Sequence, residues 1–231
     1  MDTKSKAIKT FFILYANPNQ KSLSAAVLEK TKESILKRGH KIIVSDLYQM
    51  EFNPVCGPKD FKVHLNKDNL QIMDEHKHAY KDNLVDDIKV EINKLEKADY
   101  VILIFPLWWG SCPAIMKGWF DRILVNGFAY DDDKSFGTGT LLGKRSAIFS
   151  ISAGTEKDYS VKGEHQETVK DSIAHIHRGT LAFCGIDVLP IYHLHDCLGG
   201  NKDSILKYLN GVDDIIENFG QSELLHKLSK F

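Results

Sequence analysis

The chain has 231 residues, which suits one large domain or one domain with an appendage. Its 30 basic and 31 acidic residues nearly balance and form no basic stripe, so the composition argues against a nucleic-acid partner. The longest apolar run, at about residues 100–109, is too short to cross a bilayer, and the polar start, residues 1–6, has no signal-peptide pattern, so no membrane partner is expected.

Strand-like and helix-like segments alternate along the chain. The predicted strands cover residues 7–15, 41–46, 100–105, 145–151 and 187–194, and the predicted helices cover about 22–38, 83–97, 113–124, 167–184 and 203–218. Such alternation predicts an α/β fold whose parallel sheet is covered by helices on both faces, and five strands fit the doubly wound order 2-1-3-4-5. No linker is evident, so residues 1–231 are interpreted as a single domain with an excursion at about 47–97 and a C-terminal helical segment after about 195.

Three loops should meet at the carboxyl edge of this sheet, where ligands of open α/β sheets bind: residues 17–24, 106–111 and 152–159. The first offers hydroxyls and the unpaired amides of a helix N-terminus, which suit a phosphate, although serine at such a position is more often only a cap. The second contains two tryptophans, which either form a flat wall or simply pack. The third contains Gly154, which lets a ligand approach the backbone. A phosphate at the first loop and a planar ring against the other two describe a flavin nucleotide.

Several motifs resemble the NAD(P)H:quinone oxidoreductases of DT-diaphorase type, which have a flavodoxin-like fold, over about residues 8–190. The segment 159–165 is the most specific, because Tyr159 and His165 have the spacing of that family's catalytic tyrosine and histidine. The other matching segments are residues 15–24, 44–48, 105–109, 113–122, 127–130, 142–144 and 179–185.

The resemblance implies a role for each of the three loops. The flavin phosphates would be held by Asn17, Ser22, Leu23 and Ser24, and the isoalloxazine would be flanked by Pro106, Leu107, Trp108, Trp109 and Gly110. The polar edge of the ring would be contacted by Ser152, Ala153, Gly154 and Thr155. The substrate pocket would be lined by Trp109, Gly110 and, from the partner subunit of a homodimer, Tyr130. Asn17 stands where the animal enzymes have histidine, which predicts the loss of a charge-assisted contact. Gly110 stands where some members have an aromatic residue, which predicts a wider pocket.

The resemblance also implies the reaction. A quinone, or a similar electrophilic aromatic, would be reduced by two electrons from NADH or NADPH, by ping-pong hydride transfer through one site. Tyr159 and His165 would stabilise the charge left on the reduced flavin by hydrogen bonding or proton donation; without the resemblance they are ordinary polar loop residues. The excursion and the C-terminal segment resemble the FAD-binding branch, so FAD is expected, with FMN as the alternative.

Two other functions fit the same residues. One is an azo- or nitro-compound reductase on the same flavin site, and the other is a non-catalytic, flavin-binding regulatory subunit of an ion-efflux system. The presence of both Tyr159 and His165 favours catalysis. A one-electron carrier of flavodoxin type fits poorly, because such carriers are smaller and acidic.

The cysteines and histidines do not predict a metal site. The four cysteines include no CxxC pair, which favours reduced thiols in a cytoplasmic protein. At the two positions that match the metal ligands of one family branch, the chain has Arg178 and Ala182. The residues that could still suggest a metal, without the spacing of a closed site, are His175, His177, Cys184, His193, His195 and Cys197.

Overall fold

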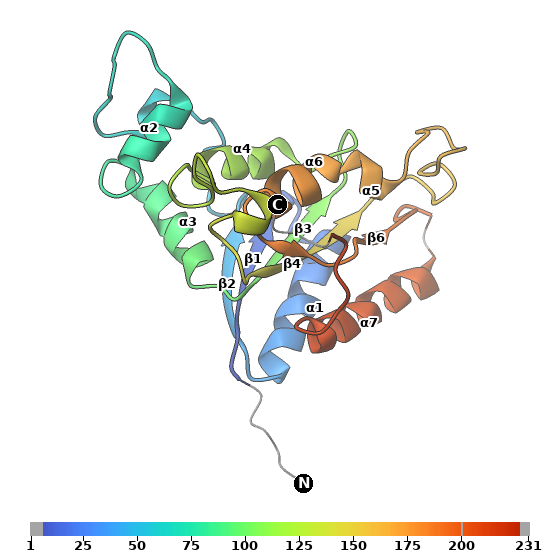
Figure 1. Ribbon diagram of the computed structural model, residues 1–231. Coiled ribbons are helices and arrows are strands. Elements are labelled where there is room, and N and C mark those ends of the chain that lie inside the picture. Colours follow the sequence, from blue (N-terminus) through green and yellow to red (C-terminus); the bar gives the residue numbers. More distant parts are fainter. Residues whose placement is uncertain (1–6, 200, 227–231) are drawn as a thin grey trace.

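The computed structural model describes residues 7–199 and 201–226. A parallel sheet runs through the molecule, with helices on both faces (Figure 1). The strand order is β2-β1-β3-β4-β5, with β6 also paired to β4, which confirms the predicted doubly wound, flavodoxin-like fold. The strands are β1 Thr10–Tyr15, β2 Lys41–Asp46, β3 Tyr100–Pro106, β4 Arg145–Ile151, β5 Asp187–Val188 and β6 Tyr192–Leu194.

Each face of the sheet has its own apolar core, because successive strand residues point to opposite sides. On β1, Phe12 and Leu14 belong to one core, whereas Phe11, Ile13 and Tyr15 belong to the other. The helices α1 Leu23–Lys37 and α7 Lys202–Asn218 lie side by side on the second face, below the sheet in Figure 1. In the described part of the chain, no helix combines the length and the apolar character needed to cross a membrane.

The other face is covered by helices from the middle of the chain. These are α3 Asp86–Glu96, α4 Ala114–Ile123 and the segment α5 Val169–Ser172, α6 Ala174–Ile176 and the π-helical turn η3 His177–Ala182. The prediction of one continuous helix over 167–184 was therefore wrong. The α-helix is interrupted at Ile173, whose φ and ψ of −99° and 19° are not helical, and the chain continues after α6 as a π-helical turn. Within that turn the Thr180 hydroxyl donates to the His175 carbonyl at 2.9 Å, which competes with the regular backbone ladder.

The predicted fifth strand, 187–194, is also wrong in its continuity. Leu189 still donates its N–H to the Ser146 carbonyl at 2.8 Å, but Pro190 has no N–H to give. The pairing resumes only at β6, where His193 lies opposite Ser150 of β4.

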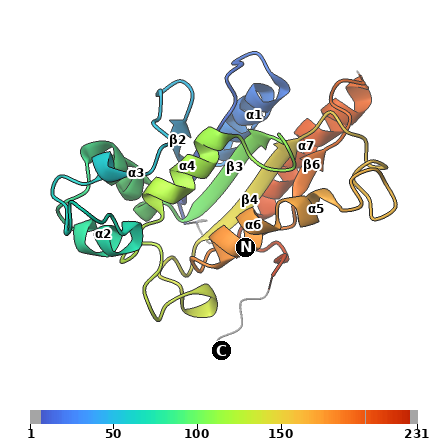
Figure 2. The ribbon, with the colours of Figure 1, turned by 90° about the horizontal axis from the view of Figure 1, so that it is seen from above.

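The excursion contains η1 Pro58–Asp60 and α2 Ile72–Ala79, and α2 lies at the edge of the molecule beyond α3 (Figure 2). The excursion is joined to α4 through Arg122, which is 2% exposed. The guanidinium lies 2.7 Å from a carboxylate oxygen of the buried Asp60 and 2.7 Å from one of Asp87 at the start of α3. One cation thus fixes the excursion and two helices together.

Candidate functional site

The three predicted loops meet around one cavity of about 400 Å³ at the carboxyl edge of β1, β3 and β4. A larger hollow of about 790 Å³ lies elsewhere, between α7 and the β5–β6 segment, and is lined by none of the predicted site residues. The residues lining the smaller cavity are Asn17, Ser22, Leu23, Ser24, Pro106, Leu107, Trp108, Ile151, Ser152, Ala153, Cys197 and Leu198.

One end of this cavity is built by the start of α1. Ser22 is the N-cap, and its hydroxyl accepts a hydrogen bond from the Ala25 amide at 3.2 Å. The buried Asn17 side chain donates to the Ser24 hydroxyl at 3.2 Å, which orients both polar groups. The first amides of a helix have no intrahelical acceptor, so those of Leu23 and Ser24 are available to an anion. Since no lining residue carries a positive charge, a phosphate here would depend on amides, hydroxyls and the helix dipole.

The second loop forms a tight turn after β3. Trp108 and Ser111 exchange two backbone hydrogen bonds, at 2.8 and 3.0 Å, and Trp109 and Gly110 between them both have positive φ angles, 52° and 70°. A left-handed backbone at a tryptophan costs about 1 kcal/mol. The Trp109 side chain is fully exposed, whereas Trp108 lines the cavity. Of the predicted ring-flanking residues, Trp109 and Gly110 therefore lie outside the cavity wall.

The third loop follows β4, and the predicted catalytic pair lies at its end and just beyond it, at Tyr159 and His165. Thr155 donates from both its amide and its hydroxyl to one Asp158 oxygen at 2.8 Å, and the His165 amide donates to the Asp158 carbonyl at 3.1 Å. These contacts fold the loop so that the Tyr159 ring stacks on the His165 imidazole. Burial, together with the charges of Asp158 and Glu167, raises the pKa of Tyr159 above 10, so its hydroxyl keeps its proton at neutral pH.

Tyr159, His165, Gly154 and Thr155 do not line the cavity itself. They are connected to it through the backbone, because Ser152 and Ala153, which directly precede Gly154, do line the cavity. Gly154 in turn packs against Tyr159, since a Cβ added to Gly154 would come within 2.7 Å of the Tyr159 ring. Their catalytic and binding roles stay predictions.

Tyr130 lies apart from the cavity lining. Its ring packs on Phe183 next to η3, with centroids 5.4 Å apart, and burial raises its pKa. Its predicted role depends on a partner subunit and stays a prediction.

Cys197, Leu198 and Ile151 line the cavity but were not among the predicted residues. Cys197 and Leu198 lie in the loop after β6, three and four residues beyond its last residue, Leu194, and β6 neighbours β4. The rule that ligands bind beyond the carboxyl ends of strands could have identified this loop as a fourth wall.

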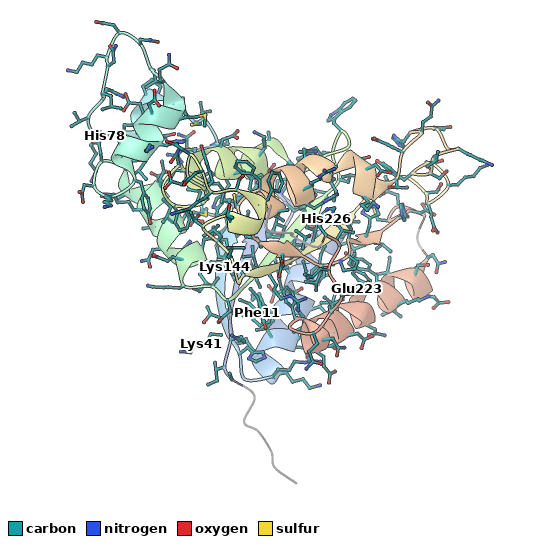
Figure 3. The ribbon with its side chains drawn as sticks, viewed as in Figure 1. Phe11, Lys41, His78, Lys144, Glu223 and His226 are labelled. Atoms are coloured by element: carbon teal, nitrogen blue, oxygen red, sulfur yellow. The ribbon has the colours of Figure 1, made fainter. Side chains whose placement is uncertain are left out.

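Two of the histidines that might have suggested a metal have other contacts. His175 Nε2 lies 2.7 Å from the Ser111 hydroxyl, and His177 Nδ1 lies 2.7 Å from His226 Nε2. Figure 3 shows the position of His226 near the C-terminal end of the described chain. Within residues 7–199 and 201–226, no cluster of three or more His, Cys, Asp or Glu residues could hold a metal ion.

Known proteins are similar to this chain in both sequence and fold. Residues 9–215 match the model of a family described as having a flavodoxin-like fold. NAD(P)H dehydrogenase (quinone) 1 of Rattus norvegicus is 37% identical over 222 residues, which cover 95% of this chain and 81% of the rat protein. This chain belongs to the NAD(P)H:quinone oxidoreductase family.

Two further family comparisons agree. The human protein named ribosyldihydronicotinamide dehydrogenase (quinone) is 36% identical over 183 residues, or 78% of this chain and 79% of the human protein. The structure of a candidate quinone reductase from Klebsiella pneumoniae superposes with a TM-score of 0.88 at 29% identity, covering 94% of this chain and 87% of that one. The fold that the motifs predicted is thus shared by relatives over nearly the whole chain.

Proposed function

We propose that this member of the NAD(P)H:quinone oxidoreductase family is a flavoenzyme that reduces quinones by two electrons at the expense of NADH or NADPH. The observation that carries the proposal is the cavity that joins the N-terminus of α1, around Ser22, to the Trp108 and Ala153 walls. A flavin nucleotide has the matching chemistry, because it is anionic at one end and planar at the other.

The cavity residues divide the work of binding. The Ser24 hydroxyl and the first amides of α1 would hold a phosphate, and the Asn17 side chain fixes the Ser24 hydroxyl for that purpose. Pro106, Leu107 and Trp108 would exclude water from one side of the ring, and Ser152 and Ala153 would face its polar edge. We propose FAD as the cofactor, with FMN as the alternative, because the excursion and the C-terminal segment resemble the FAD-binding branch.

When bound, the flavin would supply two-electron hydride chemistry between the nicotinamide and the quinone. The protein would contribute a proton donor beside it. The Tyr159 hydroxyl is protonated at neutral pH and His165 is stacked on that ring, so the pair can donate hydrogen bonds to negative charge that develops in the neighbouring cavity.

The site would be completed by a second copy of the chain. Tyr130 does not line the cavity of its own subunit and packs on Phe183, which is compatible with a role across a homodimer interface. All four cysteines are free thiols, which supports a cytoplasmic location for the protein.

The proposal is tested by purification followed by two measurements. A heat-released flavin, identified by chromatography as FAD or FMN, is expected at about one per chain. Stopped-flow mixing with NADH or NADPH should bleach the flavin band, and a small quinone should restore it. A colourless protein that takes up neither flavin contradicts the proposal. A flavoprotein that is not reduced by nicotinamide indicates the regulatory function, and one that reduces azo dyes but not quinones indicates the azoreductase.

A further inference from the structure

A histidine outside the catalytic pair connects β6 to the loop beside the cavity. His193 of β6 lies opposite Ser150 of β4, and its imidazole bridges two hydroxyls on the same side of that strand. The Nδ1 atom lies 2.7 Å from the Ser150 Oγ, and the Nε2 atom lies 2.9 Å from the Ser152 Oγ. Ser150 is fully buried and Ser152 is 4% exposed, so both hydroxyls need these partners.

The direction of these bonds follows from the Ser152 hydroxyl. It has one proton, and it donates that proton to the Gly154 carbonyl at 3.1 Å. With the proton there, Ser152 Oγ is free to accept from His193 Nε2–H while His193 Nδ1 accepts from the Ser150 hydroxyl, and this tautomer is part of the proposal below. The chain of donors runs from Ser150 through His193 and Ser152 to the Gly154 carbonyl.

The surroundings keep this imidazole neutral. Burial, together with the neighbouring His195, lowers the pKa of His193 to about 3. The two titratable rings that face it are His195, with centroids 4.4 Å apart, and Tyr159, at 6.3 Å. A ring that stays neutral keeps one nitrogen as donor and the other as acceptor, so protonation of His193 does not break the hydrogen-bond chain in the working pH range.

The Gly154 end of this hydrogen-bond chain is in contact with the predicted catalytic pair. The Gly154 carbonyl also accepts the Asp196 amide at 2.9 Å, so its peptide is held from two sides. The Cα of Gly154 in turn packs against the Tyr159 ring, which stacks on His165. A shift at Ser152 would pass directly to both rings.

We propose that His193 is a positioning residue: the chain Ser150–His193–Ser152–Gly154 sets the place of the cavity-facing loop and of the Tyr159 ring packed on it. This inference rests on the proposed function for its kinetic effect but not for its hydrogen-bond direction. In this proposal β6, which lies outside the family motifs, helps to orient the catalytic pair.

Two substitutions of similar size separate this role from simple packing. An asparagine amide reaches the position of the imidazole Nδ1 and contacts Ser150 only, whereas a glutamine amide reaches that of Nε2 and can donate to Ser152. We expect His193→Asn to slow flavin reduction by NAD(P)H about ten- to a hundred-fold, because small displacements of catalytic groups have effects of this size, and His193→Gln to keep a rate within about three-fold of the wild type. The matched control is Ser146→Ala at the other end of β4, whose hydroxyl donates to the Asp187 carbonyl; it should keep the wild-type rate.

Equal rates in the two variants would overturn the proposal, whether both are normal or both are slow. If His193→Asn does not fold, Ser150→Ala, which removes the other hydroxyl bonded to His193 and lies outside the cavity lining, takes its place, and a wild-type rate in that variant overturns the proposal. Imidazole ¹⁵N NMR of the flavin-free protein gives a readout independent of activity: His193 should carry its proton on Nε2 and not titrate from about pH 5 to about pH 8. The opposite tautomer, or titration in that range, also overturns it. A wild-type protein without flavin overturns the proposed function alone.

Discussion

The ring of Tyr159 lies nearly parallel to the imidazole of His165, with centroids 4.1 Å apart and planes inclined by 8°. The two residues are brought together by the Asp158 turn, which holds the Thr155 side chain and amide and the His165 amide. The structure thus makes a single unit of the two side chains that the motif spacing predicted to be catalytic. Removing either one should disturb the other.

The first prediction concerns the histidine of this unit. His165→Gln should slow flavin reduction by NAD(P)H by about a hundred-fold while the flavin content stays normal, since a proton donor beside the developing charge contributes about that much. Rapid-mixing absorbance at the flavin band measures the rate. His78→Gln on α2, which lies at the periphery of the molecule in Figure 3 and does not line the cavity, is the control and should change nothing. An unchanged reductive half-reaction in His165→Gln removes the proposed role.

The second prediction concerns the glycine behind Tyr159. Gly154→Ala places a methyl group within 2.7 Å of the Tyr159 ring, so the ring must move. We expect a slower reduction of the flavin with little loss of thermal stability, because Tyr159 is only partly buried and can swing outward. Gly179→Ala is the control, since its added Cβ meets no atom within 4 Å. A wild-type rate in Gly154→Ala would show that the ring position does not matter.

The third prediction concerns the ion pairs that fix the excursion. Arg122→Ala leaves the buried Asp60 carboxylate without its cation and should lower the free energy of unfolding by about 3–5 kcal/mol. Lys117→Ala removes an exposed pair with Asp121 on the same helix and should cost less than about 0.5 kcal/mol. Urea denaturation followed by circular dichroism measures both. A loss of similar size in the two variants would contradict the assignment.

The fourth prediction concerns the contact between α1 and α7. Hydrogen bonds from Lys30 and Ser34, with Arg38 nearby, hold the pKa of Asp213 below its usual range. A carboxylate whose pKa is lowered by folding stabilises the protein above its unfolded pKa, about 3.9, and this contribution disappears as the pH falls through the folded pKa. Asp213→Asn should therefore be less stable than the wild type at pH 7, and the gap should narrow below about pH 4. Thermal unfolding at a series of pH values measures the gap; a gap independent of pH would exclude the charge as its cause.

Much of the fold could be predicted because local patterns and tertiary structure agree in the first half of the sheet. β2 and β4 both occupy the predicted residues, because each is a short apolar run with polar residues at its ends. The break between β5 and β6 was missed because one apolar run crosses Pro190. The break in the helix before it was missed because the non-helical backbone at Ile173 has no signature in apolar periodicity.

For the site, the sequence predicted which loops lie at the carboxyl edge of the sheet but not the contacts that their side chains make. The rule for α/β sheets brought residues 17–24, 106–108 and 152–153 to one cavity. It could not show that Arg122 would meet Asp60, since that contact depends on the path of the excursion. Nor could it show that His193 would lie between two serines, because that depends on the register between β4 and β6.

The interruption at Pro190 also affects how copies of the protein behave in a crowded solution. A long, regular strand at the margin of a sheet offers a ladder of backbone groups onto which a foreign strand can add, the first step of aggregation. Here that margin consists of two short strands separated by a proline, and the Leu225 amide already bonds to the Val188 carbonyl at 2.7 Å. This margin is a poor template for strand addition, so the molecule is protected there against edge-to-edge association.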